Sequence, residues 1–243
     1  MKILLLAGTS EAREFAELAA TDGHQVLASL AGVTRLPKPY PVPTRHGGFG
    51  GQKAQLDFLQ EGAFDAIIDA THPFATRIAP RSQRIAERLD VPYLRLLRPA
   101  WTAGPEDRWH VIATPGEAAQ HIPISARVLL ATGAMSLEEW SGLAGDRILF
   151  CRRVDPTDTP FPFEGGWIIG RPPFSIEDEV EVLRGRQITH IVCKNAGGPA
   201  RAKLDAARQL GLPVIMQSRP PMPDCPIAET PQEAMRWLNT LKR

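Results

Sequence analysis

Short apolar runs alternate along this chain with amphipathic stretches of about ten residues, and no other sequence feature constrains its fold as strongly. After the first apolar run, Ala12, Phe15, Ala16 and Ala19 recur at helical spacing. The pattern predicts strands at residues 3–7, 25–30, 66–69 and 93–97, and helices at 10–22, 52–61 and 77–89. Apolar runs separated by helices are typical of a parallel sheet that helices cover on both faces.

A break rich in proline, glycine and tryptophan at residues 99–105 interrupts this alternation, which then begins again. At roughly 150 residues per domain, a chain of 243 residues fits one or two domains, and the break favours two α/β domains. Beyond the break, the predicted strands are residues 109–113, 128–131, 147–151, 166–169, 190–193 and 213–216. The predicted helices are 115–121, 137–143, 176–184, 200–210 and 232–241, the last capped by Thr230 and Pro231.

The charge balance and the cysteine content exclude several classes of protein. Lysine and arginine number 28, and aspartate and glutamate 27, so the net charge of +1 lacks the basic excess of a nucleic-acid-binding protein. The three cysteines lie far apart and suggest neither a disulfide framework nor a CxxC metal site. The apolar start ends after seven residues, too short for a signal peptide or a membrane helix. We therefore expect a cytoplasmic protein with no metal site.

The turn Gly8-Thr9-Ser10-Glu11 joins the first predicted strand to the first helix. At this position in doubly wound sheets, main-chain N–H groups and the positive end of the helix hold phosphate. Gly8 permits close approach of a ligand to the backbone, and Thr9 and Ser10 carry hydroxyl donors. However, the turn has one of the three glycines of GxGxxG. An ordinary helix cap, with Ser10 capping and Glu11 complementing the helix dipole, explains it equally well.

The end of the second predicted strand lacks the acidic residue that a NAD-binding fold uses to hold the ribose hydroxyls. No aspartate or glutamate occurs between Asp22 and Asp57. Ser29 and the nearby Arg35 are expected to hold a 2′-phosphate instead, which favours NADPH over NADH, although Arg35 also fits an ordinary loop charge. The expected cofactor contacts at this strand end are Ser29, Leu30, Ala31 and Arg35.

Two further segments are expected to lie at strand ends. The glycine-rich segment 47–51 predicts a loop shaped around a ligand, through Gly47 and Gly48, or a flexible connector. The segment 69–75, Asp-Ala-Thr-His-Pro-Phe-Ala, ends the strand 66–69, where open α/β sheets bind ligands. His72 is a candidate acid or base there, although a lone histidine is more often a structural hydrogen-bonding group. The expected cofactor contacts of this segment are Thr71, His72, Pro73 and Ala75.

Arginine is concentrated in residues 71–103, which hold six arginines and no lysine against two acidic residues. Four of them share one face of the predicted helix 77–89, namely Arg77, Arg81, Arg84 and Arg88. Arg95 and Arg98 follow. Because arginine binds carboxylates bidentately, this pattern favours a site for a polycarboxylate ligand, with a solvated helix face as the alternative.

The second predicted domain also has polar and basic residues where its strands end. Lys194 opens the segment 194–198, Lys-Asn-Ala-Gly-Gly, and Lys203 follows in the next helix. Arg171 precedes another predicted helix, and Arg219 follows the strand 213–216. Since the carboxyl ends of parallel strands meet at one edge of a sheet, these side chains are expected to converge there, although each also fits a structural turn.

In these segments the chain resembles the precorrin-6A reductase family of cobalamin biosynthesis, over essentially its whole length and in the same order. The blocks 69–75 and 194–198 are the most specific. The other matching segments are residues 8–13, 97–99, 132–133, 170–175 with Glu179, Lys203, 213–215 and 219–220. Arg171 is inserted where the family pattern has none, which leaves its role open.

The resemblance implies two Rossmann-like, doubly wound parallel-sheet domains with the active site in the cleft between them. It assigns NADPH binding to residues 1–103, and it assigns residues 104–243, with the C-terminal helix, to a second domain that completes the substrate cleft. The implied reaction is the NADPH-dependent reduction of one double bond of precorrin-6A to give precorrin-6B. His72 and Lys194 are the candidate catalytic residues, with Asp69 as a further candidate proton donor; a protonated macrocycle is already a good hydride acceptor, and the alternative is that no acid from the protein is needed. The expected substrate contacts are Arg98, Thr132, Gly133, Arg171, Lys194, Asn195, Ala196, Gly197, Lys203 and Arg219.

Two alternatives to this reading stay open. The substrate could be the cobalt-containing form of precorrin-6A, since the cofactor motifs do not separate the two pigments. A non-catalytic protein that closes two domains on a carboxylated ligand would also carry such motifs. We expect no flavin, no nucleic acid and no membrane as partner, and transient contacts with neighbouring enzymes of the pathway.

Overall fold

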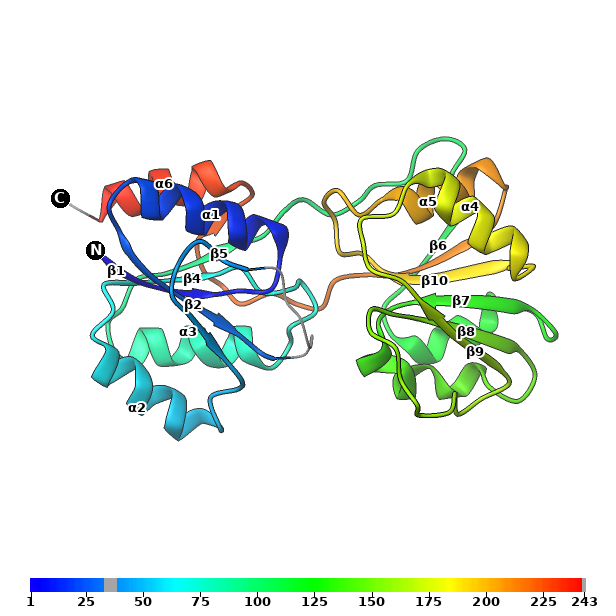
Figure 1. The fold of residues 1–243 in the computed structure, drawn as a ribbon, viewed down its shortest axis with the longest axis horizontal. Coiled ribbons are helices and arrows are strands. Elements are labelled where there is room, and N and C mark those ends of the chain that lie inside the picture. The colour runs from blue at the N-terminus through cyan, green and yellow to red at the C-terminus, as the bar shows by residue number, and fades with distance from the viewer. Residues whose placement is uncertain (33–38, 242–243) are drawn as a thin grey trace. The chain divides into compact units, whose positions relative to one another are not determined.

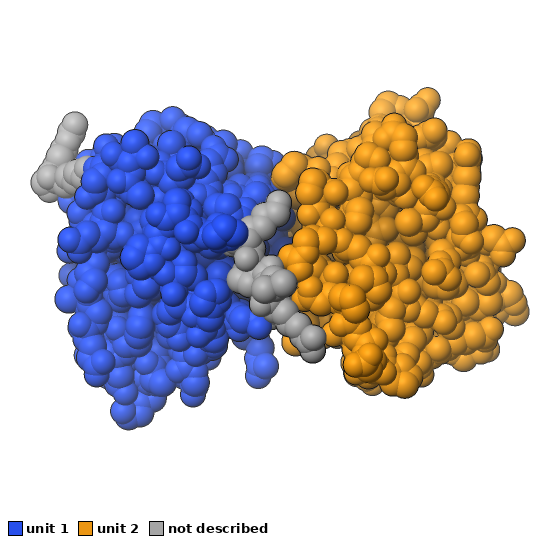
Figure 2. All heavy atoms as spheres, viewed as in Figure 1, with its two compact units in different colours: residues 1–99, 220–243 blue, residues 100–219 orange. Residues whose placement is uncertain are grey.

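The structure is a computed structural model that describes residues 1–32 and 39–241. It consists of two compact units (Figure 2), with residues 1–99 and 220–243 in unit 1 and residues 100–219 in unit 2. Each unit contains a six-stranded sheet whose neighbouring strands are all parallel. Within the described residues, no helix is both long and apolar enough to cross a lipid bilayer.

Unit 1 has the strand order β12-β5-β4-β1-β2-β3. Its strands are β1 (Lys2–Leu6), β2 (Gln25–Leu30), β3 (Thr44–His46), β4 (Ala66–Asp69), β5 (Tyr93–Leu96) and β12 (Ile227–Ala228). Its helices are α1 (Ser10–Thr21), α2 (Gln52–Gly62), α3 (Ile78–Arg88) and α6 (Pro231–Thr240). The chain moves outward from β1 in one direction and then from β4 in the other. The carboxyl ends of β1 and β4 therefore form the switch point at which such sheets bind ligands.

Both faces of this sheet are buried, which explains the continuous apolar runs in its sequence. Ile3 and Leu5 pack in the core under α1 and α6, while Leu4 and Leu6 pack in the core under α2 and α3. Figure 1 shows the same arrangement, with one pair of helices on each side of the sheet.

The expected domain boundary is wrong at the C-terminus, because residues 220–243 belong to unit 1 and not to the second unit. The strand β12 extends the first sheet, with the N–H of Arg95 donating to Pro226 O at 2.9 Å and the N–H of Leu97 donating to Ala228 O at 2.8 Å. Ala234 and Leu238 of α6 are fully buried in the core that α1 also covers. The sequence did not predict β12 because two residues carry no periodicity.

Unit 2 has the strand order β6-β11-β10-β7-β8-β9, in which the five strands from β11 to β9 repeat the arrangement of β5 to β3. Its edge strand β6 comes first in the unit, whereas β12 comes last in unit 1. Its strands are β6 (Trp109–Ile112), β7 (Arg127–Ala131), β8 (Ile148–Arg153), β9 (Gly165–Ile169), β10 (His190–Lys194) and β11 (Val214–Gln217). The helices α4 (Ile176–Gly185) and α5 (Ala202–Gln209) pack on one face of the sheet. The segments η1 (Pro115–Gln120) and η2 (Ala134–Leu143) pack on the other face, and both are 3₁₀ turns where α-helices had been expected.

Candidate functional site at the carboxyl edges of the two sheets

The strand ends that bracket the switch point of unit 1 are in register. Leu6 of β1 lies beside Asp69 of β4 on one side and beside Ser29 of β2 on the other. The turns that follow these strands therefore emerge next to one another. The N–H of Ala70 donates to Leu6 O, and the N–H of Ala7 donates to Ser29 O, both at 2.9 Å.

The turn between β1 and α1 is capped by Thr9, whereas the helix-cap alternative had assigned this role to Ser10. The Thr9 hydroxyl accepts the N–H of Ala12 at 3.2 Å and donates its proton to Ala70 O at 2.9 Å. A Cβ placed on Gly8 would meet no described atom within 4 Å, so the space beside this glycine is open among the described residues. Because the hydroxyl proton of Thr9 is used internally, an anion at this turn would be held by main-chain N–H groups and the helix dipole.

Glu11, in the first turn of α1, forms an ion pair with Arg98, which follows β5. Arg98 Nη1 lies 2.7 Å from Glu11 Oε2, and each side chain is 14% exposed. Burial raises the pKa of the Glu11 carboxyl, but its own main-chain N–H and the charge of Arg98 outweigh burial and hold that pKa below its usual value. Glu11 is therefore ionised at neutral pH, and Arg98 neutralises it beside the turn between β1 and α1.

At the end of β2, the polar partner of Ser29 is Arg45 of β3, which lies beside it in register. Arg45 Nη1 donates to the Ser29 hydroxyl at 2.7 Å, and Nη2 donates to Gly48 O at 3.1 Å. The guanidinium stacks on Phe49, 4.2 Å from the ring centre. Sequence reasoning missed Arg45 because β3 has three residues and was not predicted. The expected contact Arg35 lies outside the described residues.

The remaining expected contacts at this edge are Leu30 and Ala31, at the end of β2, and Gly47 and Gly48, in the glycine-rich loop after β3. The N–H of Gly47 donates to Leu30 O at 2.9 Å, which holds the glycine-rich loop against the end of β2. Ala31 and Gly48 are exposed.

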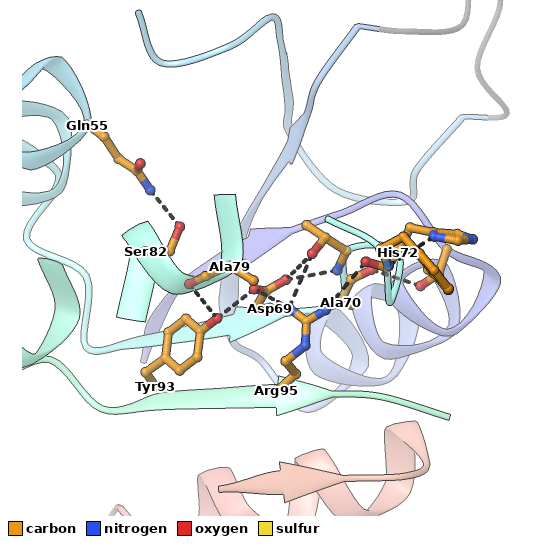
Figure 3. Close-up of polar contacts among 11 residues, drawn as sticks. Gln55, Asp69, Ala70, His72, Ala79, Ser82, Tyr93 and Arg95 are labelled. Atoms are coloured by element: carbon orange, nitrogen blue, oxygen red, sulfur yellow. Dashed lines mark hydrogen bonds and ion pairs between the residues drawn. The ribbon is translucent and has the colours of Figure 1, made fainter. Parts of the chain in front are cut away.

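The segment after β4 forms a tight turn over the sheet edge (Figure 3). The N–H of Ala75 donates to His72 O at 2.8 Å, and Pro73 is buried within the turn. The His72 side chain is exposed, and its Nδ1 accepts the N–H of Phe74 at 3.2 Å. In the neutral ring this places the proton on Nε2. Asp69 is 0% exposed, so its carboxylate has no accessible surface in this structure.

The arginines of residues 77–98 do not form one pocket. Arg77, Arg84 and Arg88 of the α3 region are exposed, which fits the solvated face. Arg81 Nε donates to the buried Gln55 at 2.6 Å, and the nearly fully buried Arg95 pairs with Asp69.

In unit 2, the turn that follows β7 and the end of β10 occupy the corresponding switch point. Gly133 precedes η2 with φ of +87°, and Thr132 is half-buried. Lys194 Nζ lies 4.0 Å from Glu139 Oε2, and its side chain is 16% exposed. Burial lowers the pKa of the Lys194 ammonium below its usual value, and the Glu139 carboxylate offsets part of this effect. A lysine with a lowered pKa is suited to donating a proton.

Other expected substrate contacts of unit 2 hold its turns together. The Asn195 side chain accepts the N–H of Trp101 at 2.8 Å and donates to Trp101 O at 2.9 Å. Arg219 donates to Asn195 O at 3.0 Å and to Ala196 O at 3.1 Å. Lys203 Nζ donates to Ala200 O at 2.7 Å and lies over the Trp101 ring. These groups position the turn after β10 and the segment at residue 101.

Arg171 and Gly197 complete the expected substrate group. Arg171 is exposed, and its Nη2 lies 2.8 Å from Asp155 Oδ1. Gly197, in the turn after β10, has φ of +68°, a conformation that favours glycine. The expected residues thus form two groups, one at the carboxyl edge of each sheet.

Comparison with known proteins shows which family this chain belongs to. A family model described as precorrin-6x reductase CbiJ/CobK matches residues 2–239. The chain is 40% identical to the precorrin-6A reductase of Rhodobacter capsulatus, over 98% of this chain and 95% of that protein. It is 38% identical to the precorrin-6A reductase of Rhodococcus erythropolis, over 100% of this chain and 99% of that protein. A solved structure titled CobK precorrin-6A reductase matches with a TM-score of 0.93 and 38% identity, covering 99% of this chain and 97% of that one. The chain therefore belongs to the precorrin-6x reductase CbiJ/CobK family.

Proposed function

We propose that this protein is a precorrin-6A reductase of cobalamin biosynthesis, which uses NADPH to reduce one carbon–carbon double bond of the macrocycle and yields precorrin-6B. The observation that carries the proposal is the full-length similarity, at 38–40% identity, to proteins named precorrin-6A reductase. The open turn at the switch point of unit 1 supports a dinucleotide cofactor.

The residues at the edge of unit 1 fit NADPH. The start of α1, with Gly8 and Thr9, would hold the pyrophosphate through main-chain N–H groups. Ser29 and Arg45 would hold the 2′-phosphate, with Arg35 as a further candidate, since a guanidinium matches phosphate geometry. The turn 71–75 would bound the cofactor on the β4 side. When bound, NADPH supplies the hydride that the reduction needs.

The residues of unit 2 fit a substrate that carries many carboxylates. Lys194 is the last residue of β10, at the switch point, and Thr132 and Gly133 lie on the adjoining turn. We assign Lys194 two tasks: it binds a carboxylate, and its lowered pKa makes it a proton source. His72, on an exposed ring, is the second candidate donor in its imidazolium form, in which Nδ1 would give up the Phe74 N–H that it accepts in the neutral ring. Asn195, Lys203 and Arg219 act through the turns that they position.

The metal-free pigment is the favoured substrate over its cobalt form. The cobalt-precorrin-6A reductase of Priestia megaterium is 28% identical to this chain, against 38–40% for the proteins named precorrin-6A reductase. We place the reaction in the cytoplasm, with the product passed on by transient contact with the next enzyme of the pathway.

The proposed function is tested by titrating the purified protein with NADPH and precorrin-6A while the pigment absorbance is followed. We expect a change of the pigment spectrum together with loss of the NADPH absorbance, and slower turnover of the cobalt form. A protein that binds the pigment and never oxidises NADPH would be the non-catalytic binder.

Arg45→Ala is expected to raise the KM for NADPH about ten- to a hundredfold and to leave the KM for NADH nearly unchanged. The reason is the loss of a charge-assisted hydrogen bond, worth roughly 1.5–3 kcal/mol, which only the 2′-phosphate receives. The matched control is Arg88→Ala. Arg88 is exposed in the last turn of α3, which returns to the amino edge of the sheet, away from the cofactor. Equal losses with both cofactors in the Arg45 variant would contradict the assignment.

A further inference from the structure

The carboxylate of Asp69 is the centre of a buried polar cluster at the end of β4 (Figure 3). Its Oδ2 accepts the Tyr93 hydroxyl at 2.5 Å and Arg95 Nη1 at 2.7 Å, both from the neighbouring strand β5. Asp69 is 0% exposed and Arg95 is 1% exposed. Burial and the Asp69 charge raise the pKa of Tyr93 far above its usual value, so the phenol remains a hydrogen-bond donor throughout the working pH range.

The other side of the same carboxylate holds the turn that follows β4. Asp69 Oδ1 accepts the main-chain N–H of Thr71 at 2.9 Å and the Thr71 hydroxyl at 2.7 Å. Arg95 Nη2 reaches His72 O at the longer distance of 3.4 Å. Two side chains of β5 are thus connected, through one carboxylate, to the backbone of the turn that carries His72.

The sheet itself holds little of this turn. The β1–β4 pairing ends with the N–H of Ala70 donating to Leu6 O. Beyond that bond, three side chains hold the first half of the turn. The Thr9 hydroxyl donates to Ala70 O, and the Asp69 carboxylate accepts the N–H of Thr71. Arg95 donates to His72 O. Since a buried ion pair adds little to net stability compared with apolar residues of similar size, stability alone is a weak reason for this cluster.

We propose that Asp69, Tyr93 and Arg95 are positioning residues that fix the Thr71–His72 backbone, and with it the His72 ring, for productive binding of NADPH. The inference rests on the proposed function, because it takes the turn 71–75 to be part of the cofactor site. The cluster touches neither cofactor nor substrate and acts through Thr71 and His72. Without the Tyr93 hydroxyl, Asp69 keeps Arg95 and Thr71 as partners but loses one of the two donors that hold Oδ2, so the carboxylate, and with it the turn, is held less firmly.

Tyr93→Phe tests the inference with the smallest change, because the ring stays and one hydroxyl is lost. We expect the dissociation constant for NADPH, measured by calorimetry, to rise about tenfold, and kcat to fall by about the same factor. The matched control is Ser82→Ala, which removes another buried hydroxyl of unit 1, bonded to Gln55 at 2.7 Å and outside the cluster (Figure 3). Both variants should lower Tm by about 2–4 °C, but the control should bind NADPH like the wild type.

A second measurement does not depend on the cofactor. Hydrogen exchange of the peptide that covers residues 70–76 should be faster in Tyr93→Phe than in the wild type, and unchanged in Ser82→Ala. A wild-type protein that does not bind NADPH would overturn the proposed function, and the exchange experiment would still report on the turn. A Tyr93→Phe protein that binds NADPH and exchanges like the wild type would overturn the positioning role.

Discussion

Replacing Arg95 with methionine is expected to lower the free energy of unfolding by about 3–5 kcal/mol, because it leaves the Asp69 carboxylate buried without its cation. Methionine keeps most of the volume of the arginine stem, so most of the loss reports the missing guanidinium, with its charge and hydrogen bonds, and not a large cavity. Urea unfolding followed by circular dichroism measures the change.

The matched control for this loss is Arg88→Met, an exposed position where the change should stay within about 0.5 kcal/mol. Adding Asp69→Asn to Arg95→Met removes the uncompensated charge and should recover part of the stability, although the amide forms fewer of the original hydrogen bonds. A loss for Arg95→Met no larger than that for Arg88→Met would contradict the buried pair as the source of the effect.

Arg98→Ala is expected to weaken NADPH binding by about tenfold or more, because Glu11 then carries an uncompensated negative charge in the first turn of α1. From the sequence, Arg98 was expected to contact the substrate. The structure places the guanidinium 2.7 Å from Glu11 Oε2, and the anionic pyrophosphate is proposed to bind at that helix start. Calorimetry with NADPH at low and high salt measures the effect, which should shrink as salt screens the repulsion.

Adding Glu11→Gln to the Arg98→Ala variant distinguishes the possible roles of Arg98. If unpaired Glu11 repels the cofactor, the double variant should recover most of the NADPH affinity that Arg98→Ala loses. An Arg98→Ala protein with normal NADPH affinity and a raised KM for precorrin-6A would instead place Arg98 on the substrate. Joint loss of both ligands with a lower Tm, and no rescue by Glu11→Gln, would make Arg98 a brace of the segment between the units.

The central strands of both sheets were predictable because they are apolar runs buried on both faces. The first strand was expected at residues 3–7 and spans Lys2–Leu6, and the strand 25–30 has the expected bounds. The strands β3 and β12 were missed because three and two residues carry no measurable periodicity. Without β12, the sequence had no signal that the last helix returns to the first sheet, so it was assigned to the second.

The positions of the candidate site were predictable from topology, but its contacts were not. Strand ends locate the turns at Gly8, Thr71 and Gly133, since parallel strands end at one edge. The pairing of Ser29 with Arg45 depends on the register between β2 and β3. In the same way, Asp69 meets Arg95 because β4 and β5 are in register there, and no spacing in the sequence encodes that contact.

The most direct test of the account uses NADPH that carries deuterium at the transferable position of the nicotinamide. The protein is incubated with this cofactor and precorrin-6A, and the pigment is analysed by mass spectrometry. The account predicts one deuterium in each product molecule, with the label retained when the reaction is run in ordinary water. A reduced pigment without the label, or a pigment that is bound and unchanged while NADPH stays intact, would contradict it.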